Sequence, residues 1–210
     1  KIGDYKFRIS ANSFFQTNTI QAEKLYNTAL EYAELKGDEI IYDLYSGAGT
    51  IAIFVSTFAK EVYGFESVES SIYDAKENLD INKIENVTFV QADLYKSFLA
   101  FTNVLPKPDV VILDPAKLTR DRDQVISALK KYNDMNKLAM SVVKPGGILL
   151  TCSCTGLVSE EDFLDMIRRA AFFAGRRAQI LKVSGAGADH PYMAHVKESR
   201  YLKAVFCRIF

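Results

Sequence analysis

Apolar and polar positions along the chain follow two alternating patterns. Short apolar runs such as 40–42 and 110–113 indicate buried strands, whereas apolar residues every three or four positions indicate helices. The strands are expected over residues 39–44, 61–65, 87–91, 110–113, 148–152, 177–183 and 201–210, after an extended segment over 6–10. The helices are expected over residues 17–35, 50–59, 70–82, 123–143 and 159–174. This alternation predicts right-handed βαβ units and an α/β fold with a doubly wound parallel sheet.

The most informative stretch joins the first of these strands to its helix. It reads Asp43-Leu44-Tyr45-Ser46-Gly47-Ala48-Gly49-Thr50. A turn with two glycines lets backbone N–H groups approach a ligand at a helix N-terminus. The stretch therefore predicts a site for a nucleotide-like ligand, with a simple tight turn as the alternative.

Three acidic residues close the neighbouring strands, where a doubly wound sheet binds its ligands. Glu66 is placed to accept hydrogen bonds from ribose hydroxyls, Asp93 from an adenine amino group, and Asp114 ends the fourth strand. With Asp43, these carboxylates favour the sulfonium and ammonium groups of S-adenosylmethionine over a pyrophosphate. A nicotinamide-dependent oxidoreductase is the alternative, because Ala52 at the third glycine position is tolerated in some dinucleotide sites.

Two cysteines end the fifth strand, in Cys152-Ser153-Cys154. Alternation keeps Cys152 in the strand and places Cys154 in the loop, so Cys154 is the candidate nucleophile. A thiolate that adds to carbon 6 of a pyrimidine makes carbon 5 nucleophilic, and a base then removes the carbon-5 proton before the thiol leaves. Asp114 is placed to hydrogen-bond ring nitrogen 3. A cysteine that serves only as a small buried apolar residue is the alternative.

With these residues, the chain resembles the class I S-adenosylmethionine-dependent RNA pyrimidine-C5 methyltransferases. Its first part, to about residue 93, is similar to the uracil-C5 enzymes through the glycine stretch and Ser13-Phe14-Phe15-Gln16-Thr17-Asn18. Its second part, from about residue 109, is similar to the cytosine-C5 methyltransferases of large-subunit ribosomal RNA. The matching stretches there are Leu149-Leu150-Thr151-Cys152-Ser153-Cys154, Ser159-Glu160-Glu161-Asp162-Phe163, Ala188-Asp189-His190-Pro191 and Arg200-Tyr201-Leu202-Lys203.

The resemblance implies a Rossmann-like class I methyltransferase fold, with a seven-stranded, mostly parallel sheet and an antiparallel C-terminal strand. It implies S-adenosyl-L-methionine as the cofactor, with Cys154 and Asp114 as catalytic residues. The cofactor-binding residues that we expect are Gln16, Asp43, Tyr45, Gly47, Gly49, Thr50, Glu66, Asp93 and Asp114. The expected reaction is cytosine-C5 methylation of RNA, with ribosomal RNA as the partner. Uracil-C5 methylation of ribosomal or transfer RNA is the alternative, followed by a divergent or recombined donor-binding domain without turnover.

Two positions depart from these families. Asp114-Pro115-Ala116-Lys117 lacks the usual second proline. The uracil enzymes carry a general-base glutamate in His-Val-Glu, whereas here His195-Val196 is followed by Lys197, with Glu198 one place late. The second departure favours cytosine over uracil.

Composition and charge change this picture little. The formal net charge is zero, from 26 basic and 26 acidic residues, so an RNA-binding surface has to be local. The candidate phosphate contacts are Lys117, Arg120, Arg122, Lys130 and Lys131, with a solvated helix face as the alternative. His190 is a candidate to line the cleft from its loop.

The cysteine content and the absence of a long apolar run predict a cytoplasmic protein without a membrane span. No His/Cys cluster has the spacing of a zinc site, so we expect no metal. The 210 residues predict one methyltransferase domain over 37–210, after a strand and a helix over 1–36. A chain that begins at Lys1 suggests a fragment, and an upstream RNA-binding domain, which both families usually carry, is a possible missing part.

Overall fold

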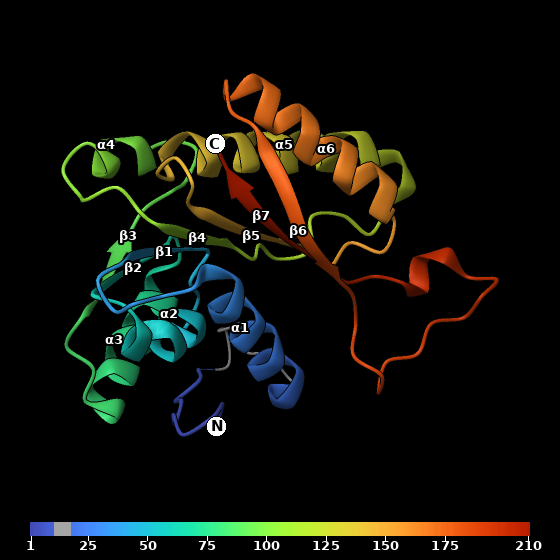
Figure 1. The fold of residues 1–210 in the computed structure, drawn as a ribbon. Coiled ribbons are helices and arrows are strands. Elements are labelled where there is room, and N and C mark those ends of the chain that lie inside the picture. The colour runs from blue at the N-terminus through green and yellow to red at the C-terminus, as the bar shows by residue number, and fades with distance from the viewer. Residues whose placement is uncertain (11–17) are drawn as a thin grey trace. The chain divides into compact units, whose positions relative to one another are not determined.

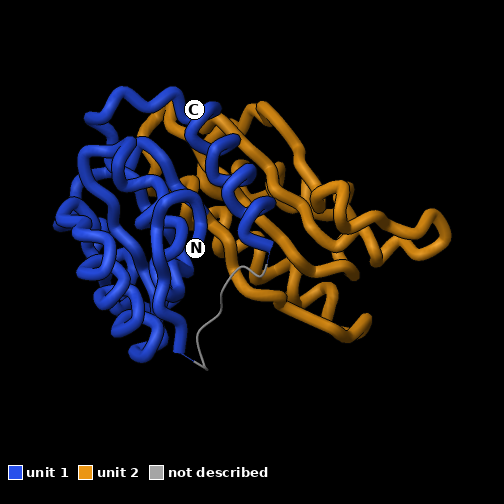
Figure 2. Tube along the Cα trace, turned by 90° about the horizontal axis from the view of Figure 1, so that it is seen from below, with its two compact units in different colours: residues 1–112 blue, residues 113–210 orange. Residues whose placement is uncertain are grey.

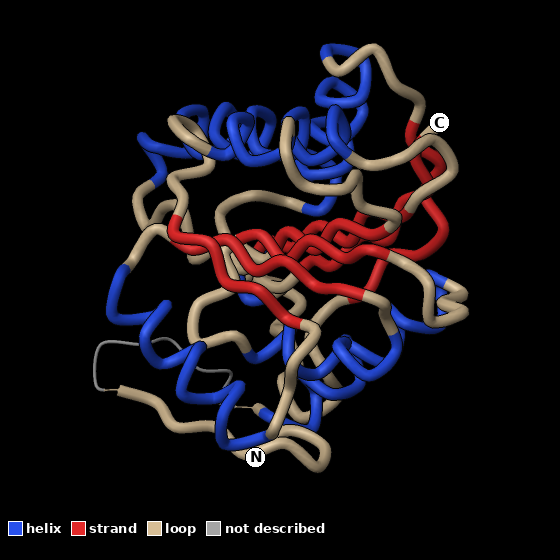
Figure 3. The backbone as a smooth tube through the Cα atoms, turned by 90° about the vertical axis from the view of Figure 1, so that its left-hand side faces the viewer, coloured by secondary structure: helices blue, strands red, loops and turns tan. Residues whose placement is uncertain are grey.

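The computed structural model describes residues 1–10 and 18–210. These residues form helices and strands joined by loops (Figure 3). The chain divides into two compact units, Lys1–Ile112 and Leu113–Phe210 (Figure 2).

The strands that the structure assigns to the described residues agree closely with the expected ones. They are β1 (Ile40–Leu44), β2 (Glu61–Glu66), β3 (Val87–Gln91), β4 (Val110–Leu113), β5 (Ile148–Ser153), β6 (Ala178–Ser184) and β7 (Lys203–Ile209). They are assigned to one seven-stranded sheet with the order β3-β2-β1-β4-β5-β7-β6. The pairs β1–β2 and β2–β3 are parallel, whereas β7 runs antiparallel to β5 and β6. The predicted fold class is therefore confirmed.

The helices of the described residues depart from expectation mainly at their ends. They are α1 (Thr19–Ala33), α2 (Thr50–Val55), α3 (Glu69–Asn82), α4 (Phe98–Thr102), α5 (Val125–Val142) and α6 (Glu160–Phe173). Three single 3₁₀ turns complete them: η1 (Ser56–Phe58), η2 (Arg122–Gln124) and η3 (Lys197–Ser199). The expected helix over 50–59 tightens into η1 after Val55, and α4 was not expected because its short pattern carries no clear period. None of the helices in the described part of the chain has the length and hydropathy that a membrane crossing needs.

In the first unit, aromatic side chains pack around β1 and β2. Tyr42, Phe65 and Phe98 are buried, with ring centroids 5.0 Å apart for Tyr42–Phe65 and 4.9 Å for Phe65–Phe98. Offset and edge-on aromatic pairs of this kind add to the free energy gained from burying their area. Figure 1 shows α1, α2 and α3 grouped beside the strands of this unit. These rings pack β1 and β2 against each other and against α4.

Two glycines of the first unit make room for one aromatic ring. Phe89 of β3 lies against Gly49 and Gly64, and a Cβ on either glycine would come within 2.5 Å of its ring. The register of β1, β2 and β3 places Gly64 between Asp43 and Phe89. Gly49 also has a left-handed φ of 83°, which favours glycine. The turn therefore needs glycine at 49 for packing as well as for backbone conformation.

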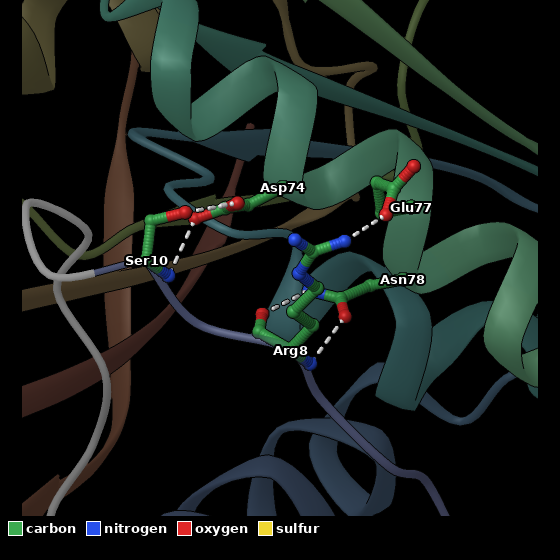
Figure 4. A network of polar contacts seen from close by, with 5 residues as sticks. All are labelled: Arg8, Ser10, Asp74, Glu77 and Asn78. Carbon is green, nitrogen blue, oxygen red and sulfur yellow. Dashed lines mark hydrogen bonds and ion pairs between the residues drawn. The ribbon is translucent and has the colours of Figure 1, made fainter.

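The N-terminal segment does not form the expected strand. Among residues 1–10 the structure assigns only an isolated bridge between Ile2 and Tyr5. The N–H groups of Arg8 and Ser10 instead donate to Asn78 and Asp74 (Figure 4). The Lys6 N–H donates to Asn82, one helical turn further along the same face of α3. The segment over residues 6–10 was predicted to be extended, and its backbone N–H groups are satisfied by side chains of α3 rather than by a neighbouring strand.

In the second unit, α5 and α6 pack side by side, with the Tyr132 and Phe163 rings 5.4 Å apart (Figure 1). α6 begins with a capping box, in which Ser159 accepts from the Asp162 N–H and Asp162 accepts from the Ser159 N–H. Arg176 donates to the carbonyl oxygens of Met140 and Val143 at the end of α5. This arginine therefore caps a helix.

Candidate functional site

A pocket of about 210 Å³ lies in the first unit where three strands end. Tyr45 follows β1, Glu66 ends β2, and Asp93 follows β3; all three line the pocket. The remaining lining residues are Phe65, Ser67, Ala92, Leu94 and Tyr95. The structure therefore brings together three of the residues that the sequence singled out, and it adds apolar walls and a second tyrosine beside them.

Glu66 holds the glycine turn through its carboxylate. Its Oε2 accepts the Gly47 N–H at 3.1 Å, and its Oε1 accepts the Ser67 and Val68 N–H groups at 2.7 and 2.9 Å. Charge-assisted bonds to backbone N–H groups are among the stronger hydrogen bonds in proteins. The carboxylate is fixed in this way while it remains half-buried at the pocket wall. Oε1 also accepts the Ser67 hydroxyl at 3.3 Å, so three of the four bonds fall on this oxygen. Each carboxylate oxygen has about two acceptor positions, and Oε2 accepts only the Gly47 N–H among these bonds, so Oε2 keeps acceptor capacity for a ligand.

Asp93 and Tyr45 complete the polar lining. Asp93 Oδ1 accepts the Tyr95 N–H at 2.8 Å, which closes the turn after β3. Tyr45 has a left-handed φ of 67°, a conformation that costs a non-glycine residue free energy. Burial raises the pKa of the Tyr45 phenol, and Tyr95, Asp93 and Glu66 raise it further, so the hydroxyl stays protonated.

The other expected cofactor residues that are described in the first unit lie in the glycine turn or in the ends of β1 and α2 that flank it. Asp43 is fully buried, and its Oδ2 accepts the Ala52 N–H at 3.1 Å in the first turn of α2. Thr50 is buried as well, whereas Gly47 is half-buried, and a Cβ added to it would meet no atom within 4 Å. The open space at Gly47 leaves room for a ligand beside the turn. Gln16 lies outside the described residues.

Asn78 of α3 links the glycine turn to the N-terminal segment. Its Nδ2 donates to the carbonyl oxygens of Ala48 and Arg8, both at 3.0 Å, while its Oδ1 accepts the Arg8 N–H at 2.7 Å. Figure 4 shows this side chain facing Arg8, beside the Asp74–Ser10 contacts. Nothing in the sequence pattern marked Asn78, because its partners are remote along the chain.

The second unit contains the candidate nucleophile. Cys154 follows β5 and is half-buried, whereas Cys152 and Cys207 are buried within strands. Burial raises the pKa of the Cys154 thiol and Asp114 raises it further, whereas Lys117 and Lys203 lower it. The net pKa of Cys154 is raised, but its thiol combines partial exposure with two cations that favour the thiolate, whereas the thiols of Cys152 and Cys207 are buried. Cys154 therefore fits the predicted role better than its neighbours do.

Asp114 lies in the same unit, directly after β4. Asp114 is half-buried, and desolvation raises the pKa of its carboxyl group to about 6. Its charge acts on the thiols of Cys152 and Cys154. An acid whose pKa lies near neutrality is suited to proton exchange with a substrate.

A buried hydroxyl network holds the loop that carries Cys154. The Tyr132 hydroxyl of α5 is 2.9 Å from Thr155 Oγ1 and accepts from Ser153 Oγ at 3.0 Å. The Leu118 N–H donates to Thr155 Oγ1 at 3.3 Å, so the segment after β4 is tied to the segment after β5. Cys154 stands between two members of this network, Ser153 and Thr155, which explains how its backbone is fixed.

The segment before β7 also reaches this loop. The Glu198 carbonyl oxygen lies so close to Gly156 that a Cβ there would approach it to 2.4 Å. The Glu198 carboxylate is paired with Arg122, one of the candidate phosphate contacts. His190 is exposed and pairs through Nδ1 with Asp189 at 3.3 Å. Its place in the cleft remains a prediction.

Comparison with known proteins identifies the family to which this chain belongs. A model of the methyltransferase domain matches residues 35–199, and the chain therefore belongs to this family. Ribosomal RNA large subunit methyltransferase I of Citrobacter koseri is 35% identical over 152 residues, which cover 71% of this chain and 38% of that protein. An uncharacterized RNA methyltransferase of Clostridium tetani is 47% identical over 116 residues, covering 55% and 25%, respectively. The chain thus spans less than half of the length of these relatives.

Solved structures share the fold at low sequence identity. The methyltransferase-like protein SMU.776, in complex with SAH, has a TM-score of 0.75 and 15% identity, with 93% of this chain and 50% of that chain covered. Trm5b of Pyrococcus abyssi has a TM-score of 0.70 and 17% identity, with 100% and 54% covered. These similarities support the methyltransferase fold.

Proposed function

We propose that this chain is an S-adenosyl-L-methionine-dependent RNA methyltransferase that methylates carbon 5 of cytosine through a covalent adduct of Cys154. The observation that carries the proposal is the half-buried Cys154 thiol with a carboxyl group, Asp114, and two ammonium groups, Lys117 and Lys203, around it. The family match and the names of the RNA methyltransferase relatives support the reaction class and the RNA substrate. Ribosomal RNA in the cytoplasm is the proposed target. We also propose that the chain consists of an N-terminal segment over residues 1–36 and a methyltransferase domain over residues 37–210.

The pocket of the first unit fits the adenosine part of the donor. Glu66 and Asp93 offer carboxylate acceptors to ribose hydroxyls and an adenine amino group, and Phe65 and Leu94 offer apolar walls. Two carboxylates in the lining repel a pyrophosphate, which argues against a nicotinamide dinucleotide. SAH in the structural neighbour supports the same ligand class. When bound, S-adenosylmethionine supplies an electrophilic methyl group on a sulfonium centre.

The proposed roles in the second unit follow from its chemistry. The Cys154 thiolate adds to carbon 6 of the ring, and the electron pair displaced from the 5,6 double bond makes carbon 5 nucleophilic. Protonated Asp114 donates to nitrogen 3 of cytosine and stabilises the negative charge of the adduct. After carbon 5 has been methylated, a base removes its proton, and the electron pair restores the double bond as the thiolate leaves.

One observation favours uracil as a second candidate substrate. With a pKa of about 6, Asp114 is mainly ionised at pH 7. A carboxylate accepts a hydrogen bond, and nitrogen 3 of uracil carries the N–H that would donate it, whereas nitrogen 3 of cytosine accepts. The base that Asp114 recognises therefore depends on which of its protonation states takes part.

Covalent trapping tests the proposal and separates the two bases. Large-subunit ribosomal RNA is transcribed with 5-fluorocytidine or with 5-fluorouridine and incubated with the protein and S-adenosylmethionine. Fluorine at carbon 5 cannot leave as a proton does, so the adduct accumulates. We expect a complex resistant to denaturation with 5-fluorocytidine RNA, lost in Cys154→Ala and kept in the control Cys152→Ala. Trapping that persists in Cys154→Ala excludes the proposed nucleophile, and trapping by 5-fluorouridine alone replaces cytosine with uracil.

A further inference from the structure

Lys203 is a buried charged residue to which the proposed chemistry assigns no step. It is 1% exposed and begins β7. The antiparallel register of β5 and β7 pairs it with Ser153, the residue directly before Cys154. The sequence motif Arg200-Tyr201-Leu202-Lys203 gave it no role. Its place in the sheet sets it beside the candidate nucleophile.

Backbone carbonyl oxygens satisfy all three N–H donors of the Lys203 ammonium group. An ammonium has three N–H donors, and the carbonyl oxygens of Thr155, Val158 and Tyr201 accept from Nζ at 2.7, 2.7 and 2.9 Å, respectively. Two of these acceptors belong to the loop after Cys154. A buried charge is costly unless its donors are satisfied, so this set of carbonyls explains how a lysine is held in the interior.

Charged groups on several elements surround Lys203 and Cys154. The ionisable groups that act on Lys203 are Cys154, Glu160, Arg200 and Lys117. Burial lowers the pKa of Lys203 to about 8, so the ammonium remains the main form at pH 7. Asp114 opposes ionisation of the Cys154 thiol, whereas Lys117 and Lys203 favour it. Lys117 is exposed and Lys203 is buried, so the charge of Lys203 is the less screened by solvent.

We infer that Lys203 is a positioning residue for Cys154, which holds the 154–158 loop by its carbonyl groups and stabilises the thiolate with its ammonium charge. The importance of Lys203 for methyl transfer rests on the proposed function. The effect of Lys203 on the ionisation of Cys154 is independent of that function, because it is a property of the protein without substrate. A lysine that only ties the loop to β7 would support the fold without changing the ionisation of Cys154.

Alkylation of Cys154 by iodoacetamide across pH separates these two roles. The modified peptide is followed by mass spectrometry, which distinguishes Cys154 from the buried Cys152 and Cys207. In Lys203→Met we expect alkylation at pH 7, where Lys203 is charged, to be about tenfold slower than in the wild type, and we expect this difference to narrow as the pH rises above 8 and the wild-type ammonium loses its proton. Lys203→Gln keeps N–H donors for the carbonyl groups but removes the charge, and the same direction is expected.

Two further variants serve as controls. Lys203→Arg keeps the charge and is expected to keep the wild-type alkylation rate at pH 7. Lys117→Met removes an exposed charge without touching the loop carbonyls, and a smaller decrease in that rate is expected with an unchanged free energy of unfolding. A wild-type rate at pH 7 in Lys203→Gln, with folding verified by circular dichroism, overturns the inference. If the rate falls in Lys203→Gln but 5-fluoropyrimidine RNA is not trapped by the wild-type protein, the inference stands and the proposed function fails.

Discussion

The pocket of the first unit, which is the proposed donor site, and the Cys154 loop are built in different ways. The pocket takes its polar groups from strand ends, and the carboxylate of Glu66 binds the turn at Gly47 and its own following residues. The Cys154 loop depends on side chains from remote parts of the unit, Tyr132 and Lys203. The polar groups of the pocket are therefore positioned by the strand ends that carry them, whereas buried polar side chains from other elements position the Cys154 loop. Substitutions should affect the two regions differently.

The largest expected effect is on the packing beneath the glycine turn. Gly64→Ala places a Cβ within 2.5 Å of the Phe89 ring and should lower the free energy of unfolding by about 3 kcal/mol, as overpacked cores do. The control Gly47→Ala has open space around its Cβ and should lose only about 1 kcal/mol through its positive φ of 54°. Urea denaturation of both proteins measures the difference. Equal losses would show that Phe89 can move aside.

Glu66→Gln should weaken donor binding next. The amide cannot accept all the N–H bonds that the carboxylate accepts, and hydrogen bonds to charged groups contribute about 1.5–3 kcal/mol, so the Kd for S-adenosylhomocysteine should rise about 10- to 100-fold. Calorimetry measures this, with the exposed Glu69→Gln as control. Alkylation of Cys154 should not change. An unaltered Kd in Glu66→Gln would place the donor elsewhere.

Tyr132→Phe should have the converse effect on the second region. It removes the hydroxyl between Ser153 and Thr155, and a lost buried hydrogen-bond partner costs about 1–3 kcal/mol. We expect lower stability and slower trapping of 5-fluoropyrimidine RNA, with the Kd for S-adenosylhomocysteine unchanged. The control Tyr73→Phe changes an exposed tyrosine. A change in donor affinity would contradict the separation of the two regions.

The pH dependence of trapping distinguishes the two bases through Asp114. Its pKa is raised to about 6, so between pH 5 and pH 7 the protonated share falls about tenfold. If protonated Asp114 donates to cytosine, the trapping rate of the wild type relative to Asp114→Asn should fall as the pH rises through 6. If the carboxylate accepts from uracil, the ratio should rise. A flat ratio would remove Asp114 from base recognition.

The smallest effect is expected where Asn78 links the glycine turn to the N-terminal segment. Asn78→Ala removes the bond to the Ala48 carbonyl oxygen, and Asn82→Ala removes comparable bonds to Lys6 without touching the turn. A neutral hydrogen bond contributes about 1 kcal/mol, so the Kd for S-adenosylhomocysteine should rise about fivefold in Asn78→Ala alone. Calorimetry on the pair measures this. Equal changes would assign the effect to the segment rather than to the turn.

The structure also shows where local sequence patterns predict poorly. The helix expected over residues 17–35 ends at Ala33, because Glu34 adopts a left-handed φ of 51°. The segment over residues 6–10, which was expected to be extended, donates from Lys6, Arg8 and Ser10 to α3 side chains. In both cases the end of the element or the partner of the segment was decided by contacts that a local pattern does not contain.

The sequence by itself determined the succession of strands and helices apart from α4, the glycine turn, and the two acidic residues that close β2 and β3 beside it. It could do so because these features depend on periodicity and on the short connections between consecutive elements. Only the tertiary structure decided that Asp43 caps α2, that Phe89 requires Gly64, and that Tyr132 and Lys203 hold the Cys154 loop. These contacts join residues that are remote along the chain, and burial makes them selective because an interior polar group must find a partner.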